Sequence, residues 1–185
     1  MKAPSEHMDS SENDNSLMII IIMGVCGSGK STIGQMLAGK LAIDFWEGDE
    51  FHPAINREKM SRGESLTEED RRPWLEKIRE VIDQYLARGA GMVVSCSALT
   101  RKSRQILGMD RQEVELIYLS GPESMLADRI HGRENHFMPA SLLRSQLETL
   151  EEPEPGEALR VSVDAEPYEL IRGILSGLRN RETGK

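Results

Sequence analysis

Short stretches of continuously apolar residues alternate along this chain with longer stretches in which apolar residues recur every three or four positions. The short stretches are bounded by turn-forming residues or rich in β-branched ones, so they predict strands. The longer stretches predict amphipathic helices. The predicted strands cover residues 17–23, 43–46, 91–95, 114–119 and 159–163. The predicted helices cover residues 30–41, 54–60, 68–88, 100–108, 122–132, 139–147 and 167–178.

This alternation predicts an α/β fold with a central parallel sheet. Strands that are apolar along their whole length suit a parallel sheet covered on both faces, and helices supply the crossovers between such strands. No internal repeat or long linker interrupts the pattern, and the acidic, proline-containing stretch 151–157 is short enough for a surface loop. We expect a disordered polar tail over residues 1–16 and a single domain over residues 17–185.

Composition and charge narrow the class of protein. Of the 185 residues 38% are hydrophobic and 29% charged, as in an ordinary globular enzyme. A formal net charge of -8 repels nucleic-acid phosphates, so we expect no nucleic-acid partner. The longest apolar run is far shorter than the ~20 residues that cross a bilayer, and the N-terminus lacks the pattern of a signal peptide. We therefore expect no membrane partner. Cys26 and Cys96 are too few for a disulfide framework, so a reducing, cytoplasmic location is expected.

The stretch GVCGSGKS at residues 24–31 matches the Walker A template, and it follows a predicted strand and opens a predicted helix. Its glycines let backbone N–H groups turn inward around phosphates, and the helix N-terminus adds partial positive charge. Lys30 is expected to reach the β- and γ-phosphates, and the Ser31 hydroxyl to bind Mg²⁺. The predicted ATP-binding residues of this loop are Gly24, Val25, Cys26, Gly27, Ser28, Gly29, Lys30, Ser31 and Thr32. The same loop serves hydrolysis, transfer and sensing of nucleotides, so other residues must decide the function.

Polar residues follow two further predicted strands, at the sheet edge that faces the ligand crevice. Asp49 is the candidate catalytic base, because a carboxylate beside the γ-phosphate can orient an acceptor hydroxyl and accept its proton. An aspartate there can equally start a turn or cap a helix. Arg71 can hold an acidic group with two hydrogen bonds, although a solvated surface arginine is the commoner situation. The small residues around Ser97 leave space for a substrate.

Arg129 and Arg133 lie four residues apart on one predicted helix face, just before the stretch HFMP at 136–139. Such arginines can stabilise the charge of a transferred phosphoryl group or stack on adenine, so residues 129–139 are a candidate lid. The alternative to a lid is that both arginines lie on a solvent-exposed helix face and contact no ligand. His52 and His136 have no carboxylate or cysteine partners at metal-ligand spacing, which argues against zinc.

Together these motifs resemble those of the gluconokinases, small P-loop kinases of the nucleoside-monophosphate-kinase-like group. The resemblance rests on GVCGSGKST at 24–32, GDEFHP at 48–53, DRRPWL at 70–75, CSAL at 96–99, RENHFMP at 133–139 and LLRSQLETLEEP at 142–153. It implies a five-stranded parallel sheet, transfer of the γ-phosphoryl group of ATP to D-gluconate with Mg²⁺ as cofactor, and a homodimer. By the same resemblance Lys30, Asp49 and Arg133 are catalytic and Arg129 binds ATP. The implied substrate-binding residues are Asp49, His52, Asn56, Lys59, Arg71, Ser97 and His136, and the implied metal ligands are Ser31 and, through water, Glu47.

The chain departs from the family pattern at several positions, which include Thr67 and Glu68 in place of the usual asparagine and aspartate. Glu47 stands where relatives usually carry aspartate, which keeps the charge and changes its reach toward Mg²⁺. Thr100 and Ser103 stand where a lysine and a tyrosine are usual. A kinase for another small hydroxyl acceptor, such as shikimate or a nucleoside monophosphate, is therefore an alternative, because the fold hosts all of these activities. A non-catalytic sensor of ATP and sugar acid is a further alternative, which the joint presence of Lys30 and Asp49 disfavours.

Overall fold

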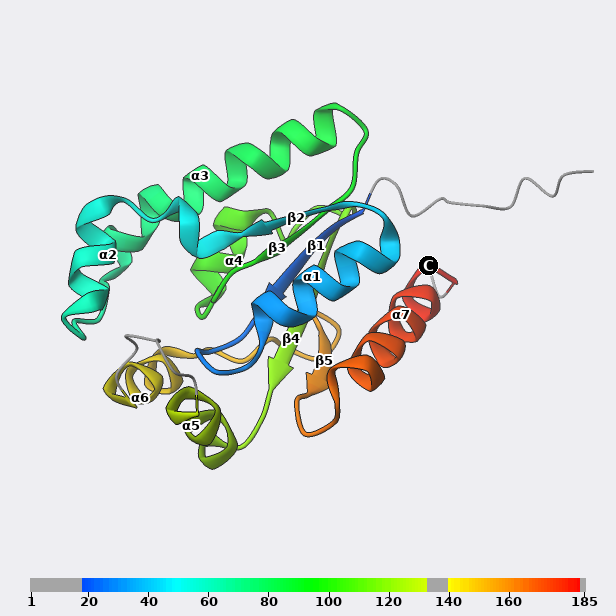
Figure 1. Cartoon of the computed structure of the whole chain (residues 1–185). Coiled ribbons are helices and arrows are strands. Elements are labelled where there is room, and N and C mark those ends of the chain that lie inside the picture. Colours follow the sequence, from blue (N-terminus) through cyan, green and yellow to red (C-terminus); the bar gives the residue numbers. More distant parts are fainter. Residues whose placement is uncertain (1–17, 133–139, 184–185) are drawn as a thin grey trace, which may run out of the picture.

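The computed structural model describes residues 18–132 and 140–183. Five parallel strands form one sheet in the order β2-β3-β1-β4-β5 (Figure 1). The strands are β1 (Ile19–Met23), β2 (Asp44–Glu47), β3 (Met92–Ser95), β4 (Val114–Ser120) and β5 (Leu159–Ser162). The predicted α/β fold with a parallel sheet is confirmed, and every predicted strand is present within two residues of its predicted ends.

The helices also lie where the apolar periodicity predicts them. They are α1 (Lys30–Leu41), α2 (Ala54–Ser61), α3 (Glu68–Ala87), α4 (Arg101–Leu107), α5 (Glu123–His131), α6 (Ala140–Thr149) and α7 (Pro167–Thr183). The last helix continues five residues beyond its predicted end, and a 3₁₀ helix, η2 (Gly48–Phe51), forms where only a turn is predicted. The predicted tail and residues 133–139 of the predicted lid lie outside the described residues.

Helices cover both faces of the sheet, and each face carries its own apolar core (Figure 1). Strand β1 lies in the middle, and its successive side chains point to opposite faces. Ile20 packs into one core with Leu37 of α1 and Ile174 of α7, whereas Ile21 packs into the other with Ile78 of α3. Because both faces are covered, β1 is apolar at every position, which is the reason for its unbroken pattern in the sequence.

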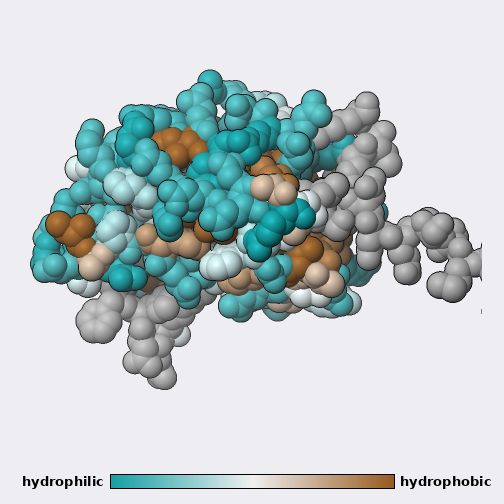
Figure 2. All heavy atoms as spheres, turned by 90° about the horizontal axis from the view of Figure 1, so that it is seen from above, coloured by the Kyte–Doolittle hydropathy of each residue, from teal (hydrophilic) through white to brown (hydrophobic). Residues whose placement is uncertain are grey.

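Figure 2 shows one face, on which hydrophilic residues predominate and apolar atoms appear in separate patches. Among the described residues, Ile55 and Tyr168 are the large apolar side chains with the greatest exposure. No described helix combines the length and the apolar character that crossing a bilayer requires.

Candidate active site

The carboxyl ends of the parallel strands meet at one edge of the sheet, and a cavity opens there. The loop after β1 contributes Cys26, Gly27, Gly29, Lys30 and Ser31 to the wall of this cavity. Of the predicted substrate-binding residues, the same wall contains Asp49, His52, Arg71 and Ser97, and it also contains Glu47, the predicted water-mediated metal ligand. The structure therefore brings the predicted phosphate loop and most of the predicted acceptor side together. This is the position at which open α/β sheets bind their ligands.

The phosphate loop has the backbone conformation that its glycines permit. Gly29 precedes α1 with a φ of 89°, in the left-handed region that residues with a side chain rarely adopt. Lys30 Nζ donates a hydrogen bond to the carbonyl oxygen of Val25 at 3.0 Å, so the ammonium group lies over the loop. The buried hydroxyl of Ser28 has no hydrogen-bond partner among the described residues. Ser31 is exposed in the first turn of α1, where its hydroxyl can bind a cation beside the loop.

The turn that carries Asp49 is held by contacts from two other elements. The backbone N–H of Gly48 donates to Ser95 Oγ at 3.2 Å, and that hydroxyl in turn donates to the carboxylate of Glu47. From α3, Trp74 Nε1 donates to the carbonyl oxygen of Gly48 at 2.6 Å. A Cβ atom on Gly48 would collide with the Ser95 carbonyl oxygen, so only glycine fits here. These contacts fix the backbone at Asp49, whose side chain is 51% exposed at the cavity.

His52 is buried against Trp74 beneath this turn. The two rings stack with centroids 4.0 Å apart, and His52 Nε2 lies 4.0 Å from Asp49 Oδ1. Burial, together with the positive charges of Arg57 and Arg71, lowers the pKa of His52 to about 4. The imidazole is therefore neutral at pH 7 and offers one donor and one acceptor. The ring therefore forms a polar part of the cavity wall beside Asp49, and because it is neutral it does not form an ion pair with that carboxylate.

Arg71 is a cation in the wall of the cavity. Desolvation by burial lowers the pKa of its guanidinium, which stays charged because arginine titrates so far above neutral pH. No carboxylate of the described residues pairs with Arg71, whereas Lys59 pairs with both carboxylate oxygens of Asp70 at 2.8 and 2.9 Å. An arginine with this environment can receive a carboxylate from a ligand.

Three predicted binding residues lie away from the cavity wall. Asn56 is buried and donates to the carbonyl oxygen of Asp70 at 2.6 Å, and Lys59 pairs with the same residue, so both connect α2 to the start of α3. Arg129 Nη2 donates to the carbonyl oxygen of Val163 at 2.6 Å, which ties α5 to the end of β5.

The remaining predicted residues fall into two groups. Gly24, Val25, Ser28 and Thr32 belong to the phosphate loop or the helix after it but do not line the cavity. Arg133 and His136 lie outside the described residues. Their predicted roles stay predictions.

Helix α6 contributes residues to the cavity that were not predicted individually. Leu142, Ser145 and Gln146 line the wall, and Gln146 Oε1 accepts a hydrogen bond from the backbone N–H of Cys26 at 2.7 Å. Their spacing of three and four residues places them on one helix face. That spacing is visible in the sequence, but it does not tell which part of the sheet the face covers.

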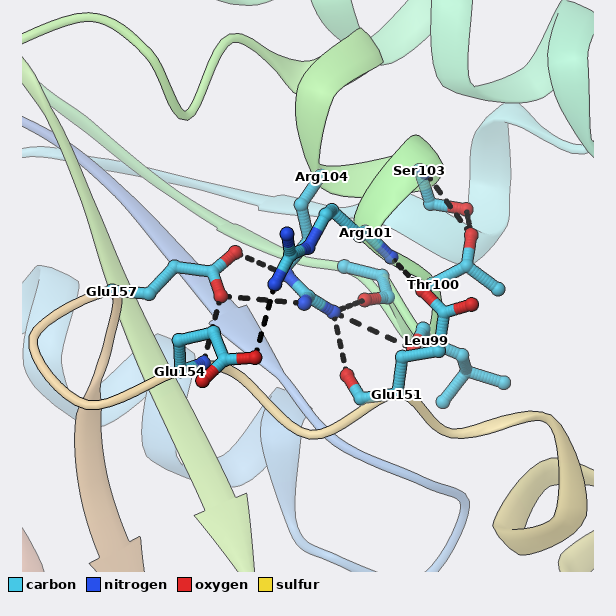
Figure 3. A network of polar contacts seen from close by, with 9 residues as sticks. Leu99, Thr100, Arg101, Ser103, Arg104, Glu151, Glu154 and Glu157 are labelled. Atoms are coloured by element: carbon cyan, nitrogen blue, oxygen red, sulfur yellow. Dashed lines mark hydrogen bonds and ion pairs between the residues drawn. The ribbon is translucent and has the colours of Figure 1, made fainter.

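A buried arginine fixes the loop that follows β3 (Figure 3). Arg104 is 1% exposed, pairs with the carboxylate of Glu157 at 2.7 Å, and donates to the carbonyl oxygens of Ala98 and Glu151 at 3.4 and 2.8 Å. Ala98 has a φ of 46°, a left-handed conformation that is unusual for alanine. The guanidinium thus stabilises the loop beside Ser97 and connects it to the segment after α6.

The two departures next to this arginine have a structural role. Thr100 Oγ1 accepts a hydrogen bond from the backbone N–H of Ser103 at 3.1 Å, which caps the N-terminus of α4. The two hydroxyls lie 2.9 Å apart and both side chains are buried. These residues support the start of α4, and neither lines the cavity.

Neither cysteine has the properties of a reactive thiolate. Burial raises the pKa of Cys26, although Lys30 opposes this shift, and burial raises the pKa of Cys96 to about 12. Both are free thiols. Over the described ranges, no group of three or more His, Cys, Asp or Glu side chains has an arrangement suited to a metal ion. Mg²⁺ in P-loop enzymes is held by one or two side chains together with substrate phosphates, so the Ser31 hydroxyl and the Glu47 carboxylate in one wall fit that ion.

A parallel sheet, a glycine-rich loop and a carboxylate in one cavity wall are typical of a P-loop kinase. A family model described as shikimate kinase matches residues 26–162. Over 184 residues the chain is 40% identical to a gluconokinase of Arabidopsis thaliana, covering 92% of this chain and 97% of that protein. It is 45% identical over 157 residues to a gluconokinase of Gluconobacter oxydans, covering 84% of this chain and 88% of that protein.

A solved structure agrees with these relatives. The crystal structure of a gluconokinase from Sinorhizobium meliloti superposes with a TM-score of 0.80 at 44% identity, over 89% of this chain and 93% of that one. The chain belongs to the gluconokinase family, and the resemblance seen in its motifs is confirmed.

Proposed function

We propose that this protein catalyses the phosphorylation of D-gluconate by ATP, giving 6-phospho-D-gluconate and ADP. The observation that carries the proposal is the position of Arg71, which forms no ion pair with a carboxylate of the described residues, in the same cavity wall as Lys30 and Asp49. A phosphate-binding ammonium, a carboxylate for the acceptor hydroxyl and a guanidinium for an acidic group are the three charges that this reaction needs. Relatives that carry the name gluconokinase at 40–45% identity support the same acceptor.

The donor half of the site binds and neutralises the triphosphate. Backbone N–H groups of the loop after β1 and the N-terminus of α1 provide partial positive charge, and Lys30 adds a full charge. In the reaction the acceptor oxygen forms a bond to the γ-phosphorus, while the bond from that phosphorus to the oxygen bridging to the β-phosphate breaks and ADP leaves. Phosphoryl transfer has little other covalent chemistry, so positioning and charge stabilisation account for most of the catalysis.

The acceptor half orients the hydroxyl and takes its proton. Asp49 lies at the cavity, and Ser95 and Trp74 hold the backbone of the preceding Gly48, so the carboxylate of Asp49 can accept the proton as the new bond forms. The neutral ring of His52 forms the adjoining polar wall. Arg71 holds the substrate carboxylate with charge-assisted hydrogen bonds, which selects a sugar acid over a neutral sugar.

Mg²⁺ is the proposed cofactor. The Ser31 hydroxyl would hold it, with Glu47 acting through water, and both are the hard oxygen donors that this ion prefers. When bound, the ion would neutralise part of the negative charge of the triphosphate.

The remaining features of the proposal rest on the family resemblance. We propose a cytoplasmic homodimer, and the two free, buried cysteines suit a reducing compartment. Arg129 and Arg133 are proposed to act on the ATP side, and His136 on the substrate side.

An acceptor-dependence assay tests the function. ADP release would be measured with Mg²⁺ and ATP in the presence of gluconate, shikimate, a nucleoside monophosphate or no acceptor. We expect turnover with gluconate alone. Turnover that requires shikimate would support the acceptor named by the family model, and ADP release independent of any acceptor would contradict the kinase proposal.

A further inference from the structure

The phosphate loop receives a hydrogen bond from a helix that is distant in the sequence. The backbone N–H of Cys26 donates to Gln146 Oε1 at 2.7 Å, and both residues line the cavity. A backbone N–H can only donate, so the oxygen of the carboxamide must face Cys26 and its NH₂ group must point elsewhere. Among the described residues none accepts a hydrogen bond from this Nε2 atom. Gln146 therefore has donor capacity left at the wall of the cavity.

The neighbouring residue of α6 reaches the acceptor side. Ser145 Oγ lies 2.6 Å from Ser65 Oγ, in the loop between α2 and α3. Ser65, Leu66 and Arg71 line the acceptor-side wall of the same cavity. Two consecutive residues of α6 thus contact the two halves of the site, the phosphate loop through Gln146 and the acceptor side through Ser145.

The position of α6 is fixed from its other end as well. Just after the helix, the backbone N–H of Glu151 donates to the carbonyl oxygen of Leu99 at 2.8 Å, and its side chain accepts from the backbone N–H of Arg101 at 2.6 Å (Figure 3). The buried guanidinium of Arg104 donates to the carbonyl oxygen of Glu151 at 2.8 Å. Contacts of Ser145 and of Glu151, which lie on either side of Gln146 along the chain, therefore hold Gln146 in place.

We propose that Gln146 binds the acceptor substrate and couples it to the phosphate loop. Its Oε1 holds the loop at Cys26, and its Nε2 donates a hydrogen bond to one hydroxyl of the polyhydroxy acid whose carboxylate is held by Arg71. One rigid amide then fixes the distance between acceptor and γ-phosphate, which is the positioning that phosphoryl transfer requires. A neutral side chain suits this place, because a carboxylate there would repel both the triphosphate and the sugar acid. The inference rests on the proposed function, since it names a contact to that acceptor.

The test compares Gln146→Leu with the parent and with Gln105→Leu, a change at an exposed glutamine of α4 that is remote from the cavity wall. We expect Gln146→Leu to raise the KM for gluconate about tenfold, the effect of one lost hydrogen bond to a substrate. The affinity for a non-hydrolysable ATP analogue, measured without acceptor, should change less than about threefold, because the other loop contacts remain. Gln105→Leu should behave as the parent.

Substrate analogues then separate a direct contact from a structural one. Monodeoxy gluconates that keep the 6-hydroxyl group would be assayed with parent and variant. If Nε2 binds one hydroxyl, the difference between parent and Gln146→Leu disappears for the analogue that lacks this hydroxyl and persists for the others. An equal penalty for every analogue would overturn the inference.

A second variant and the parent activity complete the test. Gln146→Glu keeps an oxygen for Cys26 but places a charge at the site and cannot donate, so it should lose more activity than Gln146→Leu, and parent-like kinetics of either variant would overturn the inference. Turnover of gluconate by the parent with no effect at Gln146 contradicts this inference alone. No turnover of gluconate by the parent contradicts the proposed function and the inference together.

Discussion

The indole Nε1 of Trp74 lies 2.6 Å from the carbonyl oxygen of Gly48, the residue that precedes Asp49. Trp74 is buried in the core between α3 and the sheet, and its other face stacks on His52. A core residue thus holds the backbone of the candidate base from below. The position of Asp49 and the packing of α3 therefore depend on the same side chain. A substitution of Trp74 should change both the turnover rate and the free energy of unfolding.

Replacement of Trp74 by phenylalanine should lower both the stability of the protein and its turnover rate. The aromatic stacking on His52 remains, but the buried carbonyl of Gly48 loses its donor, which costs about 1–3 kcal/mol of the free energy of unfolding. We expect kcat to fall roughly tenfold as the turn at Asp49 relaxes. Denaturant unfolding and steady-state turnover measure the two effects. Trp46→Phe is the matched control, because Trp46 donates to Tyr85 instead of the Asp49 turn, and an equal loss of kcat there would contradict the link.

Asp49→Asn should lower kcat by a factor on the order of 10²–10⁴, because the amide keeps the size of the side chain but cannot accept the hydroxyl proton. The affinity for an ATP analogue should stay within a few-fold of the parent. Steady-state kinetics with saturating ATP and gluconate measure the first effect, and equilibrium nucleotide binding measures the second.

The adjacent Glu50 provides the control for that change. It is exposed and does not line the cavity, so Glu50→Gln should leave turnover unchanged. A folded Asp49→Asn protein with turnover close to that of the parent would make Asp49 a turn-forming residue, and the base would have to be sought elsewhere.

Lys30→Ala should fold normally and lose kcat/KM by a factor on the order of 10²–10⁴, because charge that develops on the phosphates is no longer compensated. Lys40 lies in the last turn of the same helix, far along α1 from the loop, and serves as the matched lysine. Lys40→Ala should keep the parent kcat/KM. Near-native kcat/KM in Lys30→Ala would remove this ammonium from the mechanism.

The buried His52 should make the protein less stable as the pH falls. The pKa of His52 is about 4 in the folded state against 6.5 for the free side chain, so between these values the unfolded chain takes up a proton that the folded protein refuses. Stability is complete above pH 6.5 and declines below it. We expect His52 to account for a loss of about 2 kcal/mol between pH 7.5 and pH 5.

Urea unfolding at the two pH values measures this effect. His52→Gln should show a smaller difference between pH 7.5 and pH 5 than the parent, by about the same 2 kcal/mol. His131→Gln, at an exposed histidine of α5, should keep the parent difference. An unchanged pH dependence in His52→Gln would mean that this imidazole protonates as easily in the folded protein as in the unfolded chain.

Much of the fold could be predicted because each strand and helix depends mainly on residues that are close together in the sequence. The unbroken apolar run of β1 follows from burial on both faces, and the spacing of Leu75, Ile78 and Ile82 follows from one buried face of α3. The phosphate loop could be predicted for the same reason, since its glycines, Lys30 and Ser31 are adjacent in the sequence. The 3₁₀ helix at Gly48 was missed, because its contacts to Ser95 and Trp74 come from elements far along the chain.

The sequence by itself determined which segments form strands, helices and the phosphate loop, because those depend on local conformation and on one-dimensional periodicity. Only the tertiary structure decided the strand order, the buried environment that keeps His52 neutral, and the contact of Gln146 with Cys26 across 120 residues. The physical reason is that packing of helices on a sheet brings together groups whose separation along the chain carries no information about their distance in space. Which residues form each wall of the active site therefore depends on that packing.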